Sequence, residues 1–215
     1  MSHPLALIVG AGPGLGLAIA RRFTQEDFRL ALIVRPSDLE ALRTECPKAV
    51  VIGADLGEAK ALDQALLEVQ AQAGFPDVLI FNAASGTRGS MATQEAEWLR
   101  RDFQVNILAP LACVQWVLPA MLAQGQGTVL FSGGGLALQP KPGEGAPALG
   151  KAAQRSLALS LAEELAPQNI HAALVTIAGF LQPQTPFSPA AVAESFWQLH
   201  QEEKAAWRTE VILKP

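Results

Sequence analysis

The stretch LALIVGAGPGLG, residues 5–16, predicts how the chain begins to fold. Residues 5–9 form an unbroken apolar run that ends in glycines, which is typical of a buried strand. From residue 14 to residue 24 the apolar side chains recur at helical spacing, so a helix is expected to follow directly. A glycine-rich turn between a first strand and a first helix is the place where doubly wound sheets bind phosphate groups.

The glycines of this turn have an informative spacing: they are Gly10, Gly12, Gly14 and Gly16. The GxGxxG spacing fails because Leu15 stands at its third glycine, whereas GxxxGxG fits. Glycine lets the backbone turn sharply and approach a diphosphate, and the helix that follows offers free N–H groups. An ordinary turn rich in glycine is the alternative. We predict that the turn, with Pro13 and Leu15 between its glycines, binds a dinucleotide.

The remaining chain alternates short apolar runs with longer amphipathic stretches. Strands are expected at 5–9, 30–34, 49–52, 78–81, 128–131, 171–177 and 210–213, and helices at 14–24, 38–44, 58–73, 94–122, 148–165 and 189–201. Strands that alternate with helices pair in parallel through right-handed crossovers. The pattern predicts a three-layer Rossmann fold, a doubly wound parallel β-sheet with helices on both faces, as a single domain over residues 1–215.

Composition narrows the classes of partner. Half of the 215 residues are hydrophobic and the net charge is -4, which gives no basic surface for nucleic acid or for membrane lipids. We find neither a signal peptide nor an uninterrupted apolar run of ~18 residues, so no membrane contact is expected. Cys46 and Cys113 are far apart and lack a Cys/His cluster, so neither a disulfide scaffold nor a metal site is expected. A cytoplasmic location fits these features.

The end of the second predicted strand bears on the choice of cofactor. Sites for NAD place an acidic residue there, about 20 residues after the glycines, to bond the ribose 2′-OH. This chain has Val34 and Arg35 instead. A guanidinium can bind a 2′-phosphate through two hydrogen bonds, whereas a carboxylate would repel it. Arg35 therefore favours NADP over NAD; a solvated surface arginine is the alternative.

With these features in order, nearly the whole chain resembles the short-chain dehydrogenase/reductase family. The glycine spacing matches the family motif, and Asp55-Leu56 after the third strand is similar to its adenine-contacting aspartate. Asn82, Ala83 and Ala84 resemble the family's Asn-Asn-Ala-Gly stretch, whose first asparagine is replaced here by phenylalanine. The resemblance implies that these residues contact the cofactor.

Two further positions match the catalytic part of that family. Asn106 corresponds to its helix asparagine, and Lys151 to the lysine that holds the nicotinamide ribose. The family's tyrosine acid would lie four residues before this lysine, where the chain has Pro147. The family's serine would fall at Gly134, and the nearest serine, Ser132, lies two residues earlier. The sequence contains no tyrosine, so no realignment restores the acid.

The missing tyrosine leaves two interpretations open. Hydride transfer to a carbonyl leaves an alkoxide that needs a proton, and a positioned acid contributes about 10²–10⁴ in rate. In the first interpretation the chain is an NADP-dependent oxidoreductase of a small-molecule carbonyl/alcohol pair, with Lys151 or a water as acid, Ser132 polarising the substrate and Asn106 as the third catalytic residue. In the second it is a catalytically silent dinucleotide-binding sensor or scaffold. Lys151 as a plain solvated lysine is a further alternative.

The resemblance also implies how the substrate side is covered and how copies of the chain assemble. The short stretch between residues 177 and 189 leaves little chain for a helical lid, so an open substrate side is expected. The resemblance implies a homodimer or homotetramer formed through the helices 94–122 and 148–165. Apolar residues compatible with such an interface are Leu108, Leu111, Val114, Val117, Leu157 and Leu161. The C-terminal segment resembles a family branch without the tyrosine, and its tryptophans are expected to serve in packing.

Overall fold

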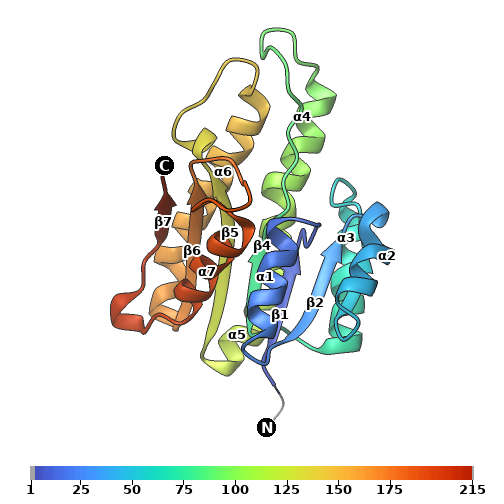
Figure 1. Ribbon diagram of the computed structural model, residues 1–215, viewed down its shortest axis with the longest axis vertical. Helices are drawn as coiled ribbons and strands as arrows, with labels where there is room; N and C mark the ends of the chain where they lie inside the picture. Colours follow the sequence, from blue (N-terminus) through green and yellow to red (C-terminus); the bar gives the residue numbers. More distant parts are fainter. Residues whose placement is uncertain (1–2, 215) are drawn as a thin grey trace.

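The apolar runs form one parallel sheet in the computed structural model, which describes residues 3–214 (Figure 1). The strands are β1 (Leu5–Val9), β2 (Arg29–Val34), β3 (Val50–Gly53), β4 (Val78–Phe81), β5 (Gly127–Gly134), β6 (Ile170–Ile177) and β7 (Glu210–Leu213). Their order in the sheet is β3-β2-β1-β4-β5-β6-β7. The order reverses between β1 and β4, and such a switch point is where open parallel sheets bind ligands. The predicted doubly wound Rossmann fold is confirmed.

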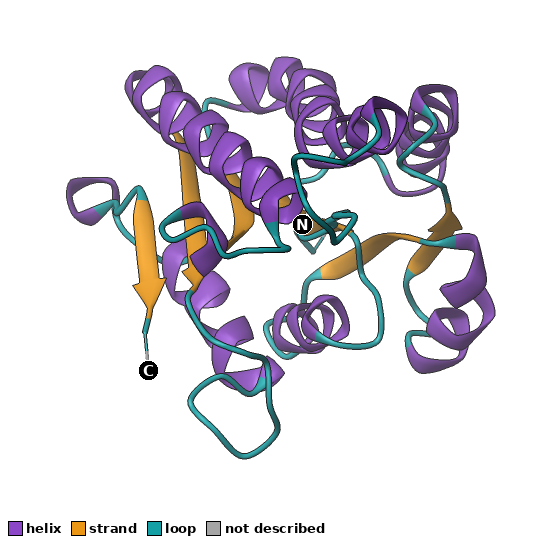
Figure 2. Cartoon of the chain, turned by 90° about the horizontal axis from the view of Figure 1, so that it is seen from above, coloured by secondary structure: helices purple, strands orange, loops and turns teal. Residues whose placement is uncertain are grey.

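Helices cover both faces of this sheet (Figure 2). They are α1 (Leu15–Thr24), α2 (Leu39–Glu45), α3 (Ala59–Ala73), α4 (Ala96–Phe103), α5 (Ala109–Gln124), α6 (Gly145–Leu165) and α7 (Pro189–His200). Leu7 and Val9 of β1 join the core under α3, α5 and α6, whereas Ala6 and Ile8 join the core under α1, α2 and α7. Because both faces are covered, every residue of β1 is buried, as its unbroken apolar run predicts.

Two element boundaries differ from the prediction by three residues for local reasons. β5 continues through Gly134 because β6 pairs with it along its whole length, up to the pair Gly134–Ile177. α6 begins at Gly145, three residues before the predicted start, so Pro147 lies in its first turn. Proline is tolerated there because N–H groups of a first helical turn have no intrahelical acceptor.

The long predicted helix 94–122 contains an irregularity. α4 and α5 are joined by a π-helical segment, Gln104–Leu108, into one run that ends at Gln124. Pro110 follows this segment; it lacks an N–H, and its ring crowds the carbonyl four residues earlier, that of Asn106. The wider turn places Asn106, a predicted site residue, at the irregularity. π-Helical turns are frequent at functional sites.

One helix bears on the expectation of no membrane contact. The continuous helix Ala96–Gln124 contains an 18-residue window with a mean hydropathy of 1.7, so by length and composition it is able to cross a bilayer. This helix contains no uninterrupted apolar run of that length, because a few polar residues interrupt its apolar sequence. In the structure 44% of that window is buried inside the protein. Core helices of sheet proteins share this composition because they are apolar on most sides.

The helix faces expected to form a subunit interface are in part core. Val114 and Val117 of α5 and Leu161 of α6 are buried against the sheet, because they lie on the inner sides of their helices. Leu108, in contrast, is 51% exposed, and Leu111 and Leu157 are half-buried. Only the outer residues of the proposed set remain available to a second copy.

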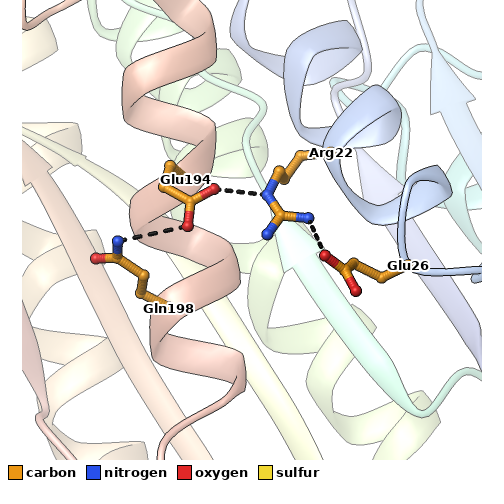
Figure 3. A network of polar contacts seen from close by, with 4 residues as sticks. All are labelled: Arg22, Glu26, Glu194 and Gln198. Carbon is orange, nitrogen blue, oxygen red and sulfur yellow. Dashed lines mark hydrogen bonds and ion pairs between the residues drawn. The ribbon is translucent and has the colours of Figure 1, made fainter.

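The C-terminal helix packs on the first helix. In Figure 3 the Arg22 guanidinium of α1 donates to Glu194 of α7 (2.6 Å) and to Glu26 (2.7 Å), and Gln198 donates to Glu194. The guanidinium also lies 4.7 Å from the centre of the Trp197 ring. Trp197 therefore serves in packing, as expected, and the first and last helices stabilise each other.

His200, the last residue of α7, is enclosed at this junction. Its Nδ1 lies 3.0 Å from Oγ1 of Thr128, and its ring contacts those of Phe23 and Phe28. Burial lowers the pKa of His200 to about 4, since a charged imidazole loses its hydration there. The unfolded chain therefore binds a proton at His200 at a higher pH than the native chain does.

We predict an acid-sensitive fold. Between pH 6.5 and about 4 the unfolded state takes up the His200 proton and the native state does not, so stability is complete above pH 6.5 and falls by about 3 kcal/mol on acidification. The measurement is the free energy of unfolding in urea at several pH values from 7.5 to 4. In His200→Gln this free energy should fall less on acidification than in the wild type, because the His200 contribution is absent. His3→Gln, which changes an exposed histidine, is the control. Equal slopes in the wild type and in His200→Gln would contradict the assignment.

Candidate functional site

The glycine turn is shaped by three backbone segments in close contact. Gly10 has a φ of +89°, and a Cβ there would lie 2.6 Å from the Cα of Ala83, in the loop after β4. A Cβ on Gly16 would lie 2.5 Å from the Cα of Ala11. Neither position accepts a side chain, because β1, the start of α1 and the loop after β4 touch there.

Gly14, in contrast, faces open space. A Cβ added to Gly14 meets no atom within 4 Å, although this residue is the N-cap of α1. Within residues 3–214, no protein acceptor reaches the N–H groups of Leu15 and Gly16. Free N–H groups at a helix N-terminus carry partial positive charge and attract anions. Gly10 and Gly16 thus allow backbone segments of the protein to pack closely, whereas Gly14 leaves open space in front of the helix N-terminus.

A cavity of about 370 Å³ adjoins this turn at the carboxyl ends of the first four strands. Predicted site residues that line it are Gly10, Gly12, Arg35, Asp55, Leu56, Asn82, Ala83 and Ala84. The cavity wall does not include Pro13, Gly14, Leu15, Gly16, Asn106, Ser132 and Lys151. Residues that sequence reasoning missed are Ile33, Val34, Asp38, Ala54, Ser85, Arg101 and Val105. The topology therefore gathers segments from four strand ends around one hollow.

Two ion pairs lie in the wall of the cavity. Nε and Nη2 of Arg35 each lie 2.9 Å from Oδ2 of Asp38, one short turn later in the chain. Nη2 of Arg101 lies 2.8 Å and 3.0 Å from the two oxygens of Asp55. The Arg101 guanidinium and the Gly57 N–H lower the pKa of Asp55. Spacing along the chain does not predict the second pair, because its partners come from different elements.

The loop after β4 is fixed by polar side chains. Nδ2 of Asn82 donates to the carbonyl of Gly10 (2.8 Å), and Oδ1 of Asn82 accepts from the hydroxyl of Ser132 (2.6 Å). Ser132 is buried, and its hydroxyl proton is occupied by this bond. Asn82 thus ties the glycine turn to β5, and Ser132 supports Asn82.

Asn106 and a buried acid hold the next part of the same loop. Both ends of the Asn106 carboxamide bond the backbone of Ser85, at 3.0 Å and 2.6 Å. Asp102, one turn earlier, accepts from the Ser85 hydroxyl (2.6 Å) and from the Thr87 N–H (2.8 Å). Asp102 is 3% exposed and was not predicted; an acid on an amphipathic helix reads as a surface residue in the sequence.

Lys151 contacts the end of β5 and does not line the cavity. Its ammonium donates to the carbonyl of Ser132 (2.6 Å) and to Oε1 of Gln154 (2.9 Å), and burial lowers its pKa to about 8. It is therefore not a plain solvated lysine. A Cβ on Gly134 would lie 3.5 Å from the Lys151 side chain, so the residue at the family's serine position is its neighbour. Pro147 packs on Gly86, whose absent Cβ would lie 2.6 Å from the proline Cγ.

The site has neither of the two hydroxyl groups that the resemblance implies. Proline and glycine occupy the two positions, and no tyrosine exists elsewhere. Among residues 3–214 no group of three or more His, Cys, Asp or Glu side chains is placed to hold a metal ion. The groups that can do chemistry here are an anion-binding helix terminus, two ion pairs in a cavity and a lysine with a lowered pKa.

Comparison with known proteins agrees with this geometry. A family profile described as short chain dehydrogenase matches residues 4–188. The short-chain dehydrogenase/reductase eriH of Hericium erinaceus is 29% identical over 178 residues, which cover 78% of this chain and 71% of that protein. Across the curated relatives that it matches, the chain spans between 45% and 71% of their length.

Two solved structures match this chain over nearly their whole length. A short-chain dehydrogenase from Rhodopseudomonas palustris is 29% identical with a TM-score of 0.84, covering 99% of this chain and 98% of its own. A metagenomic short-chain oxidoreductase in complex with NADP is 26% identical with a TM-score of 0.88, covering 99% and 96%.

Two single alanine substitutions should separate the roles of the glycines. Gly16→Ala forces a Cβ into the backbone of the turn and should lower the free energy of unfolding by about 2 kcal/mol or more. Gly14→Ala adds the same atom in open space and should change it by less than about 1 kcal/mol. Urea unfolding of both variants measures the contrast. If Gly14→Ala proved the more damaging, the described geometry of the turn would be wrong.

Proposed function

Because the chain belongs to the short-chain dehydrogenase family, we propose that it binds NADP(H) and acts as an oxidoreductase on a carbonyl/alcohol pair without the usual tyrosine acid. The observation that carries the proposal is the open N-terminus of α1 at Gly14, which adjoins the cavity lined by Arg35 and Asp55. Anion-binding N–H groups and a neighbouring hollow with a cation are what a dinucleotide phosphate requires.

Each part of the cofactor finds a chemically fitting group. The N–H groups of Leu15 and Gly16 would hold the diphosphate, with Pro13 and Gly14 leaving room for it. Asp55 and Leu56 would contact the adenine, and Arg35 would bind the 2′-phosphate. The loop of Asn82, Ala83 and Ala84 leads from this end towards Lys151. When bound, NADPH supplies the hydride.

The proton is the remaining requirement, and Lys151 is the proposed donor. The Ser132 hydroxyl donates to Asn82 and the Asn106 amide to Ser85, so both groups support the site rather than supply a proton. The Lys151 ammonium keeps a pKa of about 8, close to the working pH at which a general acid is most effective. Its proton at Nζ would pass to the developing alkoxide of a small-molecule substrate.

A second candidate function rests on a different observation. Pro147 packs against Gly86, and Gly134 leaves bare backbone beside Lys151, so neither position that the family fills with tyrosine and serine carries a hydroxyl here. That arrangement favours a catalytically silent NADP(H)-binding sensor or scaffold. Both candidates share the cofactor and differ only in turnover.

We also propose that the chain is a homodimer or homotetramer in the cytoplasm. Leu108, together with Phe103 and Trp98 on the preceding turns, leaves apolar surface exposed along the α4–α5 run. Exposed aromatic and aliphatic groups on neighbouring turns are typical of subunit contacts.

Cofactor binding can be tested by titration with NADPH, followed by its fluorescence. We expect Gly14→Val to lower the affinity about tenfold or more, because the added side chain occupies the room in front of the free N–H groups. Ala152→Val, which also creates a branched valine but on the exposed side of α6, should leave it unchanged. Arg35→Leu should weaken NADPH binding and spare NADH. Wild-type binding unaffected by Gly14→Val would refute the location of the diphosphate.

Turnover decides between the two candidates. A panel of aldehydes and ketones assayed with NADPH should show activity that declines as the pH rises through about 8, since Lys151 then loses its proton. Lys151→Ala should lose the activity, and Lys151→Arg should lose most of it as well, because arginine stays charged and does not release a proton. An inert wild type beside an active Pro147→Tyr/Gly134→Ser double variant would establish the silent protein instead. Brisk turnover in Lys151→Ala would exclude the proposed acid.

A further inference from the structure

Asp38 joins a short 3₁₀ turn to α2 and does not cap the helix. It ends the turn Pro36–Asp38 and directly precedes α2, and its own backbone is helical, whereas a capping residue has an extended backbone. In the structure its side chain makes no capping hydrogen bond. Its carboxylate lines the cavity instead, so local helix stability does not explain its orientation.

The carboxylate points towards the glycine turn. The absent Cβ of Gly12 would lie 3.8 Å from Oδ2 of Asp38, which places the acid over the second glycine of the turn. Its side chain is 16% exposed, whereas that of its partner Arg35 is 74% exposed. Of the two charges, the negative one is the more enclosed and lies nearer to the turn.

One oxygen of the acid remains available. Both contacts from Arg35 end on Oδ2, and no donor within the part of the chain that the structure describes reaches Oδ1. A free carboxylate oxygen accepts a hydrogen bond from a hydroxyl group and repels a phosphate. At the carboxyl end of β2, Arg35 therefore favours a 2′-phosphate and Asp38 favours a ribose 2′-OH. Sheets of this type distinguish these two groups at that place.

From this arrangement we propose that Asp38 is a specificity-determining residue that counteracts Arg35. The inference rests on the proposed function, because it concerns the same cofactor site. Arg35 attracts the 2′-phosphate, while Asp38 both occupies the Arg35 guanidinium and repels that phosphate. Asp38 can also accept from an unphosphorylated ribose, so the native protein keeps a usable affinity for NADH and a smaller preference for NADPH than Arg35 alone would give.

The test compares ligands that differ only in the 2′-phosphate. NADPH and NADH are titrated against wild type, Asp38→Asn and Asp38→Ser, with adenosine 2′,5′-bisphosphate and 5′-AMP as competing fragments. Glu40→Gln removes an equal charge two residues further on, from an exposed carboxylate paired with Arg43. Circular dichroism of each variant checks that α2 is intact, and the serine variant supplies a second, smaller uncharged side chain if the asparagine variant is poorly folded.

We expect Asp38→Asn to tighten the phosphorylated ligands about fivefold or more and to leave the unphosphorylated ones equal or weaker. Glu40→Gln should change neither by more than about twofold. Higher salt should reduce the gain, because the repulsion that has been removed is electrostatic. Parallel changes for both ligand classes, or weaker binding of the phosphorylated ones, would overturn the role of Asp38. Failure of wild type to bind any of the four ligands would instead refute the proposed function itself.

Discussion

The structure depends on the close approach of β1, the start of α1 and the loop after β4 at the glycine turn. Gly10 and Gly16 are in contact with neighbouring backbone, and Asn82 bonds the Gly10 carbonyl across the same junction. Because these contacts leave no space for side chains, the turn is held rigidly while its outer side at Gly14 stays free. The same constraint that packs the sheet thus leaves backbone N–H groups without partners at the helix tip.

Much of the fold was predictable because both faces of the sheet are covered. A strand buried on two sides is an unbroken apolar run, so β1 and β4 were predicted with the bounds that the structure shows. The predicted bounds of β7 also agree with the structure, although β7 lies at the edge of the sheet and is only partly buried. The extension of β5 to Gly134 was not predicted, since glycines carry no periodic signal and only pairing with β6 orders them. The π-helical segment was missed for a similar reason: the sequence shows Pro110 but not how the preceding turn adjusts.

Site residues were predictable where they belong to a sequence motif. They were not predictable where their role depends on a side-chain contact between two separate elements. The glycines and Arg35 were proposed from their spacing, and Asp55 was proposed from the family resemblance. Arg101 escaped notice because its partner Asp55 is 46 residues away, and only the fold brings the two together. Ser132 was expected to polarise a substrate, yet its hydroxyl supports Asn82, and that bond depends on the register of β4 and β5. Whether Lys151 supplies a proton remains a proposal.

The packing of α7 on α1 has a consequence for the order of events at the ribosome. The apolar side of α1, with Phe23 at its end, is covered by Trp197 and its neighbours, which are synthesised about 175 residues later. At about 5–20 residues per second, that delay amounts to roughly ten to thirty-five seconds. During this interval the nascent chain carries an uncovered first helix, so its earliest element is among the last to mature.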